Sequence, residues 1–328
     1  MYANIKNYRG CLKWYLVLCK LFFRLPWIGR IIRNRIETNV IKNLEKCRYD
    51  CVISFQESAS LPFVAKFSNS FKIAWIHCDY SRIFTNEEKE LSIFSNYSKI
   101  VTVSKYTKKV FCNLFPSLAS RVEIIYNLMD YDAIVEKSKK PIDDKRFLTD
   151  SFIILSVGRI SAVKQFDVIP QIAAKIKIKQ RRFKWFIIGG NHEGKAYISL
   201  MNAIAEYSVE DVVICLGEKS NPYPYFKAAS ILVSTSSSEA CPMIFNEAKI
   251  LNVPIVTNNF GSSREFVSEG IDGYICTIEE MPDIIYSMMD TDTAFQTEIT
   301  SDFSEKEILL RIDNLLCNFD NEEGSKDV

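Results

Sequence analysis

The pattern of apolar and polar positions along the chain changes character at about residue 50. From there on, short apolar runs bounded by polar breaks alternate with segments of helical periodicity. Runs that are apolar throughout are typical of parallel strands buried on both faces. The pattern therefore predicts an α/β protein with parallel sheets covered by helices. The expected strands are 51–56, 71–76, 99–104, 122–127, 152–159, 183–190, 211–217, 229–236, 253–259 and 273–277, and the clearest helices are 164–179, 194–207, 242–251 and 305–319.

A polar stretch divides the expected strands into two groups. Residues 129–150 are rich in acids and lysines, which is typical of a linker. The chain has 328 residues, enough for two domains of ordinary size. We expect a first Rossmann-like domain at 1–149 and a second at 150–300. Residues 301–328 are expected to form a helix that returns toward the first domain, followed by a disordered tail.

The first 35 residues are apolar, aromatic and basic at once. Lys13, Lys20 and Arg24 interrupt the apolar residues, so no run reaches the ~20 residues that a membrane-spanning helix needs. No small-residue cleavage site of a signal peptide follows. Two interpretations stay open: a core helix with solvated lysines, or a helix over residues 10–35 that lies on an anionic membrane surface. Lacking an export signal, the chain is expected to be cytoplasmic, with the second interpretation making it peripheral to the inner face of the membrane.

Composition argues against several classes of partner. The formal net charge is +1, so nothing in the overall charge favours nucleic acid. The ten cysteines are scattered without a CxxC pair, and the chain has only two histidines. A zinc site and a disulfide scaffold are therefore not expected, and free thiols fit a reducing compartment.

Two glutamates, Glu239 and Glu247, flank the start of a predicted helix. The preceding strand ends just before them, and ligands of open parallel sheets bind outside the carboxyl ends of the strands. Pro242 suits the first helical turn, which leaves the N–H groups of Met243 and Ile244 free to bind a phosphate. The carboxylates could accept hydrogen bonds from ribose or sugar hydroxyls. Alone, they are also compatible with a surface acid and a helix-stabilising acid.

A second polar cluster follows the strand expected at 152–159. Gly158 allows a tight turn, and Arg159 and Lys164 come directly after it. Both cations are thus expected at the same carboxyl edge of the sheet as the two glutamates. Permanent positive charges that face a helix N-terminus would neutralise a diphosphate, including one that leaves with developing charge.

Taken in order, these motifs resemble the donor half of a retaining glycosyltransferase of the GT-B fold, family 4. The resemblance covers 151–276 and includes a G-R-x4-K run, "IIGG" and an E-x7-E motif formed by the two glutamates. The first half is similar less specifically, through "YDCVISFQES", "KIAWIHCDYS", "VTVSKYTKKVF" and "VEIIYNLMD". The resemblance implies an α/β GT-B architecture, in which two Rossmann-like, doubly wound domains face a cleft.

The resemblance also implies a role for each motif residue. Gly158, Arg159 and Lys164 would hold the diphosphate of the donor. The amides of Met243 and Ile244 would help to hold its phosphates.

The remaining matched residues concern the sugars. Glu247 would accept the ribose hydroxyls, and Glu239 would face the transferred sugar. His77 follows the strand expected at 71–76 and matches a histidine that lies near the donor sugar in this family. By itself, a lone histidine at that position could equally be a packed residue. His192 also lies near a strand end, but little favours a function for it.

Two departures from the family pattern stand out. Ala240 and Cys241 replace the glycine and the bulky apolar residue common after the first glutamate, so we expect altered packing of that loop. The start of the chain lacks the strand and glycine-containing turn with which family members usually begin. We therefore expect a first domain shortened at its N-terminus.

Two D-x-D pairs have the spacing that metal-dependent glycosyltransferases use. Asp130 and Asp132 lie in the expected linker, and Asp290 and Asp292 lie past the last strand, so we expect surface acids. With two permanent cations available for the diphosphate, the site is expected to need no metal. No cofactor is expected, because the nucleotide sugar is a substrate.

These expectations describe a glycosyltransferase that moves a sugar from a nucleotide-diphosphate donor to a glycan or lipid-linked acceptor with retention of configuration. The setting would be synthesis of a cell-surface polysaccharide or glycoconjugate. Two alternatives remain. The shortened first domain is compatible with a nucleotide-sugar-binding subunit that is catalytically impaired or depends on a partner, and the fold is compatible with a sugar-nucleotide epimerase.

Overall fold

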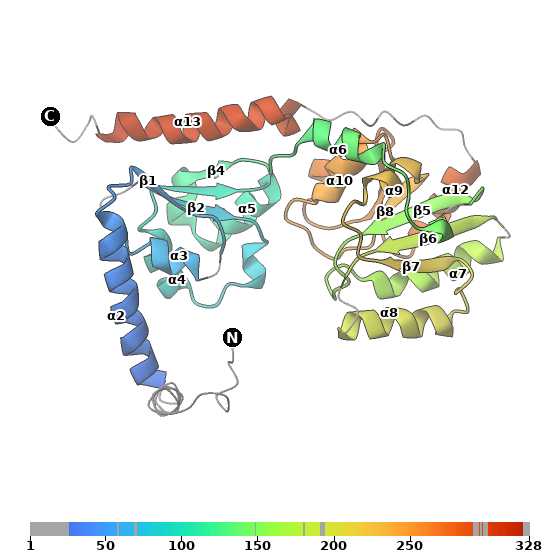
Figure 1. Ribbon diagram of the computed structural model, residues 1–328, viewed down its shortest axis with the longest axis horizontal. Helices are drawn as coiled ribbons and strands as arrows, with labels where there is room; N and C mark the ends of the chain where they lie inside the picture. Colours follow the sequence, from blue (N-terminus) through green and yellow to red (C-terminus); the bar gives the residue numbers. More distant parts are fainter. Residues whose placement is uncertain are drawn as a thin grey trace.

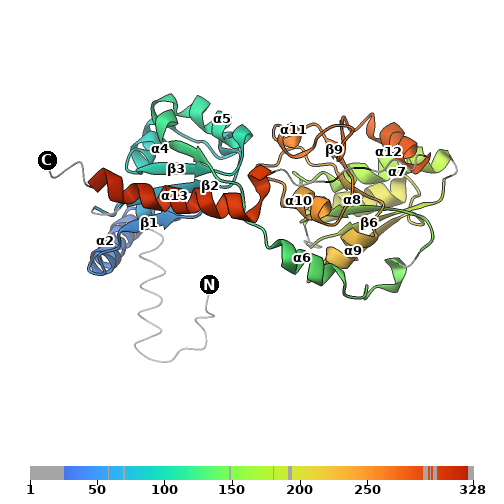
Figure 2. The same ribbon diagram turned by 90° about the horizontal axis from the view of Figure 1, so that it is seen from above.

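The computed structural model describes residues 26–323 apart from 58, 69–70, 148, 180, 191–193, 291–294, 296 and 298–300. These residues form two α/β domains that lie side by side, with the long helix α13 running along the first (Figures 1 and 2). All strand pairs in both sheets are parallel, as the unbroken apolar runs predicted.

The first domain is built on a sheet with the strand order β1-β2-β3-β4 among its described residues. The strand β2 is buried along its whole length because two apolar clusters cover it. One cluster includes residues of α4 and α5, and the other includes Ile308 and Leu315 of α13. The elements are β1 (Cys51–Ser54), α3 (Ser60–Val64), β2 (Phe71–Ile76), a 3-10 turn η2 (Tyr80–Arg82), α4 (Glu87–Phe94), β3 (Lys99–Thr102), α5 (Lys105–Leu114), η3 (Pro116–Arg121), β4 (Val122–Ile124) and α13 (Glu305–Glu323).

The second domain has a sheet of order β10-β9-β8-β5-β6-β7. The order reverses between β5 and β8, which is the point where open parallel sheets bind ligands. The elements are β5 (Phe152–Val157), η5 (Phe166–Val168), α7 (Ile169–Ile178), β6 (Phe183–Ile188), α8 (Lys195–Glu206), β7 (Val213–Gly217), α9 (Tyr223–Ala228), β8 (Ile231–Ser234), α10 (Met243–Ile250), β9 (Ile255–Asn258), α11 (Ser263–Phe266), β10 (Gly273–Cys276), α12 (Met281–Asp290) and η6 (Ser301–Phe303).

Two helix starts differ from the predicted ones. The helix expected from residue 164 begins as α7 only at Ile169, because Gln165 has a left-handed backbone (φ 49°) that a helix cannot include. The second difference concerns the helix expected at 242–251, in which Pro242 is predicted to lie inside the first turn. Pro242 is instead the N-cap residue, with ψ of 91°, and α10 starts at Met243.

The expected linker contains a helix of its own. α6 (Tyr131–Ser138) packs against α9 and α10 of the second domain, and a short turn η4 (Lys145–Phe147) follows it. The Asp130 carboxylate accepts a hydrogen bond from the N–H of Ala133 at 2.8 Å, so this acid caps the helix. Asp132 lies in the first turn of α6, where a negative charge is favourable. Each member of this D-x-D pair therefore has a helix-stabilising position.

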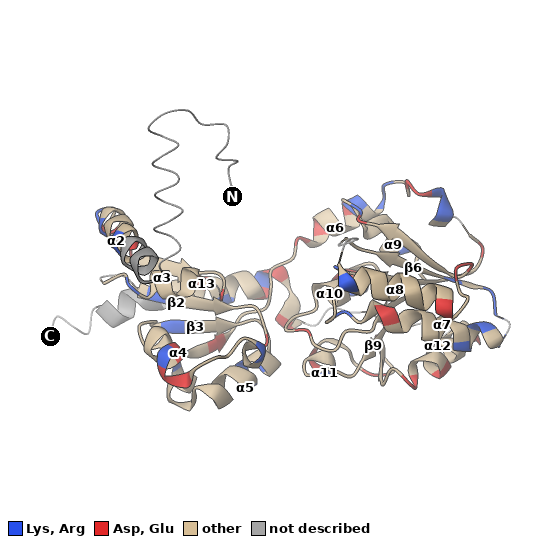
Figure 3. Ribbon diagram, turned by 90° about the horizontal axis from the view of Figure 1, so that it is seen from below, with Lys and Arg blue, Asp and Glu red and all other residues tan. Residues whose placement is uncertain are grey.

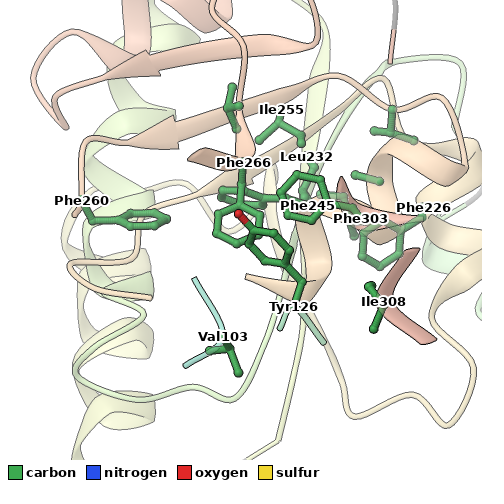
Figure 4. Close-up of a cluster of buried hydrophobic side chains, with 14 of the residues drawn as sticks. Val103, Tyr126, Phe226, Leu232, Phe245, Ile255, Phe260, Phe266, Phe303 and Ile308 are labelled. Atoms are coloured by element: carbon green, nitrogen blue, oxygen red, sulfur yellow. The ribbon is translucent and has the colours of Figure 1, made fainter. Parts of the chain in front are cut away.

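The two domains share an apolar cluster. Tyr126, just after β4, packs against Phe266 of α11 and Phe303 of η6, with ring centroids 6.0 and 4.4 Å apart. Figure 4 shows these rings close to Phe245 and Ile255 of the second domain. Burial of these aromatic side chains stabilises one arrangement of the domains.

The helix α2 (Pro26–Glu45) contains part of the basic N-terminal segment. Of its side chains from residue 34 on, Ile41 is buried, whereas Ile36 and Val40 are 58% and 42% exposed. Figure 1 shows α2 projecting from the first domain. Within the described residues, no helix combines the length and the apolar character needed to cross a bilayer. Residues 10–25 of the segment expected at a membrane, like the tail from 324 on, lie outside the described residues.

Candidate functional site

The carboxyl edges of the two sheets face each other. The N–H groups of Lys105 and Tyr106, at the start of α5 after β3, donate to the Glu265 carboxylate at 2.7 and 3.2 Å. The Tyr126 hydroxyl donates to the same carboxylate at 2.6 Å. Glu265 lies in α11, which follows the carboxyl end of β9. Loops at the ends of the strands therefore line the space between the domains.

The turn after β5 has the tight geometry expected of it. Gly158 has a backbone φ of 153°, which residues other than glycine rarely adopt. A Cβ atom at this position would also lie 3.1 Å from the Lys164 side chain. Gly189 lies so close that a Cβ atom there would be 1.9 Å from the Gly158 carbonyl oxygen. The glycines thus let the backbone of this edge pack closely and leave room for Lys164.

Lys164 and Glu239 form an ion pair at the centre of the edge. The Lys164 Nζ atom lies 2.5 Å from Glu239 Oε1, and the side chains are 20% and 17% exposed. The Ser236 hydroxyl donates to the same carboxylate oxygen at 2.7 Å. Two further bonds hold the loops together: Thr235 Oγ1 donates to the Lys164 carbonyl at 2.7 Å, and the Ser237 N–H donates to the Val163 carbonyl at 2.9 Å. The sequence placed both charges at one edge but did not predict their direct contact.

Glu247 lies deeper, on α10. The hydroxyl of Tyr223 donates to its carboxylate at 3.4 Å. Burial raises the pKa of this carboxyl, while the Tyr223 hydrogen bond and the charge of Lys164 oppose the rise. A partly buried carboxylate with a single long hydrogen bond is ready to accept hydroxyl donors from a ligand.

The start of α10 completes this side of the site. No side chain caps the helix, and its N-cap residue Pro242 has no side-chain acceptor. The N–H groups of Met243 and Ile244 belong to the first turn, which has no intrahelical partners. Together with Lys164, this end of the helix favours an anion.

A cavity of about 340 Å³ adjoins the Gly158 turn. Arg159 is exposed and lines it, and makes no ion pair with any other described residue. The sequence did not predict this cavity, since its walls come from the ends of three different strands. The lining residues are Val157, Gly158, Arg159, Ile188, Gly189, Gly190, Glu218, Lys219 and Pro222.

His77 lies across from these groups, at the carboxyl end of β2. Its ring packs against Phe55 and Trp75, with centroids 4.7 and 6.3 Å apart, and the backbone N–H of His77 donates to the Glu57 carboxylate. Burial lowers the pKa of His77, so the imidazole is neutral at pH 7. The structure places His77 on the facing edge, in contact with first-domain residues. His192 lies outside the described residues.

Sequence reasoning missed the residues that join the domains at the site. The ring of Tyr106 lies on Gly261, where a Cβ atom would be 2.1 Å from its Cε2 atom. The neighbouring Ser262 hydroxyl donates to the Glu239 carbonyl at 2.7 Å. Contacts thus run from the first domain through this loop to Glu239. The glycine in "NFGSSREF" was the available signal, but only the packed domains show what approaches it.

No cluster of three or more metal-ligating side chains occurs within the residues that the structure describes. The eight cysteines among them are free thiols. One of these, Cys241, lies in the loop between Glu239 and α10, where burial raises the pKa of its thiol to about 12. A thiol with this pKa remains protonated at neutral pH and packs as an apolar group.

Residues 138–288 match the family described as glycosyl transferases group 1. The chain is 23% identical to uncharacterized glycosyltransferase MJ1059 of Methanocaldococcus jannaschii over 256 residues, which are 72% of this chain and 61% of that protein. It is 26% identical to spore coat protein SA of Bacillus subtilis over 269 residues, 76% of this chain and 70% of that protein. The match therefore spans less than two thirds of the M. jannaschii relative.

Among solved structures, HepE of Anabaena in complex with UDP has a TM-score of 0.74 at 17% identity. The matched residues cover 87% of this chain and 82% of that chain. This similarity confirms the two-domain GT-B fold that the sequence predicted.

Proposed function

We propose that the chain is a glycosyltransferase, because residues 138–288 match the family described as glycosyl transferases group 1, and that it transfers a sugar from a nucleotide-diphosphate donor to a glycan or lipid-linked acceptor. We further propose that the configuration at the anomeric carbon is retained. The observation that carries this proposal is the Lys164–Glu239 pair between the Gly158 turn and the uncapped start of α10. At one edge of the sheet it brings together groups that can bind phosphates and a carboxylate that can accept hydrogen bonds from sugar hydroxyls.

Each part of the donor has a matching group. The diphosphate would lie at Lys164 and the first turn of α10, with Arg159 beside it. The ribose hydroxyls would donate to Glu247. The base would enter the cavity next to Gly158, and the sugar would face Glu239. The positions of the diphosphate, the ribose and the sugar are those that the sequence resemblance implied, whereas the position of the base is proposed from the cavity. The geometry supports the arrangement because these groups lie along one edge.

The transfer itself would follow from this placement. The acceptor hydroxyl oxygen forms a bond to the anomeric carbon on the same face from which the diphosphate leaves, so the configuration is retained. The hydroxyl proton passes to a phosphate oxygen of the leaving diphosphate. Lys164 stabilises the charge that develops on the leaving nucleoside diphosphate, without a metal ion being required. The neutral imidazole of His77 would approach the donor sugar from the first domain. Closure of the domains would exclude water and so favour transfer over hydrolysis.

The proposal is tested by incubating the purified chain with UDP-, GDP- and ADP-sugars and a range of glycoside acceptors. We expect nucleoside diphosphate release that depends on one donor and one acceptor class, and a product whose anomeric configuration matches the donor. Epimerised free sugar without any transfer product would contradict the proposal, as would nucleotide binding without turnover under all conditions.

The pH dependence of nucleotide binding tests the role of Glu247. Its raised pKa means that the carboxyl holds its proton to higher pH than an ordinary glutamic acid. Only the ionised form accepts from both ribose hydroxyls, so affinity should fall as pH drops through that pKa, by up to about tenfold per pH unit. Calorimetric titration with UDP and GDP over a pH series measures this fall.

Two controls separate Glu247 from the phosphates of the ligand, which also titrate. A 2′,3′-dideoxy nucleotide keeps the phosphates but lacks the ribose hydroxyls. Its affinity should therefore change less with pH, because the contribution of Glu247 to the pH dependence is lost. The Glu247→Gln variant should bind the ribonucleotide more weakly and with the same shallow slope. A Gln variant with the wild-type slope would show that another group titrates.

We propose that the N-terminal segment, residues 10–35, attaches the enzyme to an anionic membrane surface at the cytoplasmic face. The exposed Ile36 and Val40 on α2 support an apolar contact next to the basic residues. Figure 3 shows basic residues on the described part of α2. Lys13→Ala and Lys20→Ala should each weaken binding to phosphatidylglycerol vesicles about fivefold. Cosedimentation measures this, and equal binding to neutral vesicles would contradict the electrostatic part of the proposal.

A further inference from the structure

An exposed aromatic ring lies at the carboxyl edge of the first sheet, on the side that faces the donor groups. Phe55 directly follows β1 and is 59% exposed. The parallel register pairs Ser54 with Ala74, which brings the residues after them, Phe55 and Trp75, side by side. His77 follows at the end of β2. The three rings form an aromatic row across the ends of the two strands.

The ring of Phe55 is exposed but held in place. A single exposed apolar side chain on a surface needs no explanation. Phe55, however, contacts Trp75 with centroids 5.2 Å apart and an interplanar angle of 49°, and contacts His77 at 4.7 Å and 57°. Trp75 is only 7% exposed, so it anchors the row in the core. Phe55 therefore presents a positioned aromatic surface to solvent, which lowers the entropy cost of binding a ligand against it.

The polar groups around the ring include neutral donors and acceptors. The imidazole of His77 is uncharged at pH 7 because burial lowers its pKa. One ring nitrogen donates to the Trp75 backbone, which leaves the other as an acceptor for a ligand hydroxyl. Gln56 is exposed next to Phe55, and its backbone carbonyl is held by the hydroxyls of Ser54 and Ser60 at 3.2 and 2.9 Å. The nearby Glu57 carboxylate accepts a hydrogen bond from the backbone N–H of His77. These neutral groups suit a ligand that carries hydroxyls. In the second domain, by contrast, the cations and the start of α10 suit phosphates.

We propose that Phe55, with Gln56 and His77, forms a subsite for a neutral pyranose residue of the acceptor glycan. A pyranose ring has an apolar face of C–H groups that stacks on an aromatic ring, and hydroxyls at its rim that bind amide and imidazole groups. The row lies at the edge that faces Lys164 and Glu239, so a sugar stacked there would reach toward the donor from the opposite side. This inference rests on the proposed transferase function for its meaning, but the binding of a sugar does not depend on turnover.

Saturation-transfer NMR with simple glycosides tests the subsite directly. The probes are the methyl glycosides of glucose, galactose, mannose, N-acetylglucosamine and N-acetylgalactosamine. We expect the ring protons of at least one glycoside to receive saturation from the full chain. Phe55→Ala should weaken its affinity about tenfold, whereas Phe55→Trp should keep it, because stacking needs a ring rather than a phenylalanine. The matched control is Tyr207→Ala, which removes an aromatic ring 37% exposed on the second domain and should change nothing.

Three outcomes would overturn the subsite. These are no saturation of any glycoside, equal saturation in Phe55→Ala, and Phe55-dependent binding of farnesyl phosphate in place of the glycosides. The last would show that the ring binds an isoprenoid chain, for which the exposed Ile53 two residues earlier would be a neighbour. Binding of UDP and GDP is recorded on the same samples. If the nucleotides do not bind, the donor site is refuted while the result for the glycosides stays valid. If the nucleotides bind but Phe55→Ala does not change glycoside binding, only the subsite is refuted.

Discussion

Lys164→Met is expected to weaken the binding of a nucleoside diphosphate about a hundredfold and to reduce sugar transfer at least as much. The Nζ atom of Lys164 lies 2.5 Å from Glu239, and both side chains are mostly shielded from solvent. Removing the cation leaves the carboxylate unpaired beside the position proposed for the phosphates. Like charges in a shielded site repel, and truncating one partner of such a pair costs several kcal/mol, about 2 to 5. Methionine keeps the apolar stem of the lysine, so packing is preserved.

The measurement is calorimetric titration with UDP and GDP, beside thermal unfolding to confirm the fold. Lys227→Met is the matched control, because Lys227 is an exposed lysine of the same domain with no described ion pair. The double variant Lys164→Met/Glu239→Gln should recover part of the affinity, since it removes the unpaired negative charge as well. Wild-type affinity in Lys164→Met for every nucleotide tested would refute the diphosphate assignment.

Gly261→Ala is expected to reduce sugar transfer about a hundredfold while leaving nucleotide affinity within about threefold of wild type. A Cβ atom at this position would lie 2.1 Å from the Tyr106 ring, far inside contact distance, so the ring must move. Because the Tyr106 hydroxyl is hydrogen-bonded to Asp79 at 2.8 Å, we expect the ring to stay with the first domain and the two domains to shift apart. The groups for the diphosphate all belong to the second domain and would stay in place. His77 and the acceptor edge belong to the first domain and would move away. A misplacement of about 1 Å can cost a hundredfold in rate.

Small-angle scattering should show a more extended molecule for Gly261→Ala than for wild type. The rate is the release of nucleoside diphosphate from whichever donor the wild type uses. Tyr106→Ala/Gly261→Ala provides the internal control, since it removes the ring and makes room for the new methyl group. The double variant should therefore be as compact as Tyr106→Ala alone. If Gly261→Ala keeps both the wild-type scattering and the wild-type rate, the contact between the domains does not set the geometry of the site.

The second domain was well predicted because its signals are local. Each of its strands is a short apolar run, and the motif residues directly follow those runs. Gly158 and Lys164 are six positions apart, and Glu239 and Glu247 are eight apart, so strand–loop–helix units alone brought each pair to the carboxyl edge. The errors concern helix starts, at Gln165 and Pro242, where the backbone conformation of a single residue decided the boundary.

The contacts between distant segments were not predictable in the same way. Lys164 and Glu239 are 75 positions apart, and nothing local to either indicates that they meet. Glu265 accepts from Tyr126, which is 139 positions away, and from two N–H groups of α5. The exposure of Phe55 was equally hidden, since its sequence surroundings match those of a buried strand. Such features depend on which surfaces the domains and the C-terminal helix cover.

By itself, then, the sequence determined the α/β class, the parallel strands and the chemical kinds of group gathered at the edge of the second sheet. Apolar periodicity and turn residues act over a few positions, and a parallel sheet brings the ends of its strands to one edge. Only the tertiary structure decided that Lys164 pairs with Glu239, that Tyr106 packs on Gly261, and that Phe55 is left open beside His77. Those contacts depend on close packing between segments far apart in the chain, which the order of residues does not reveal locally.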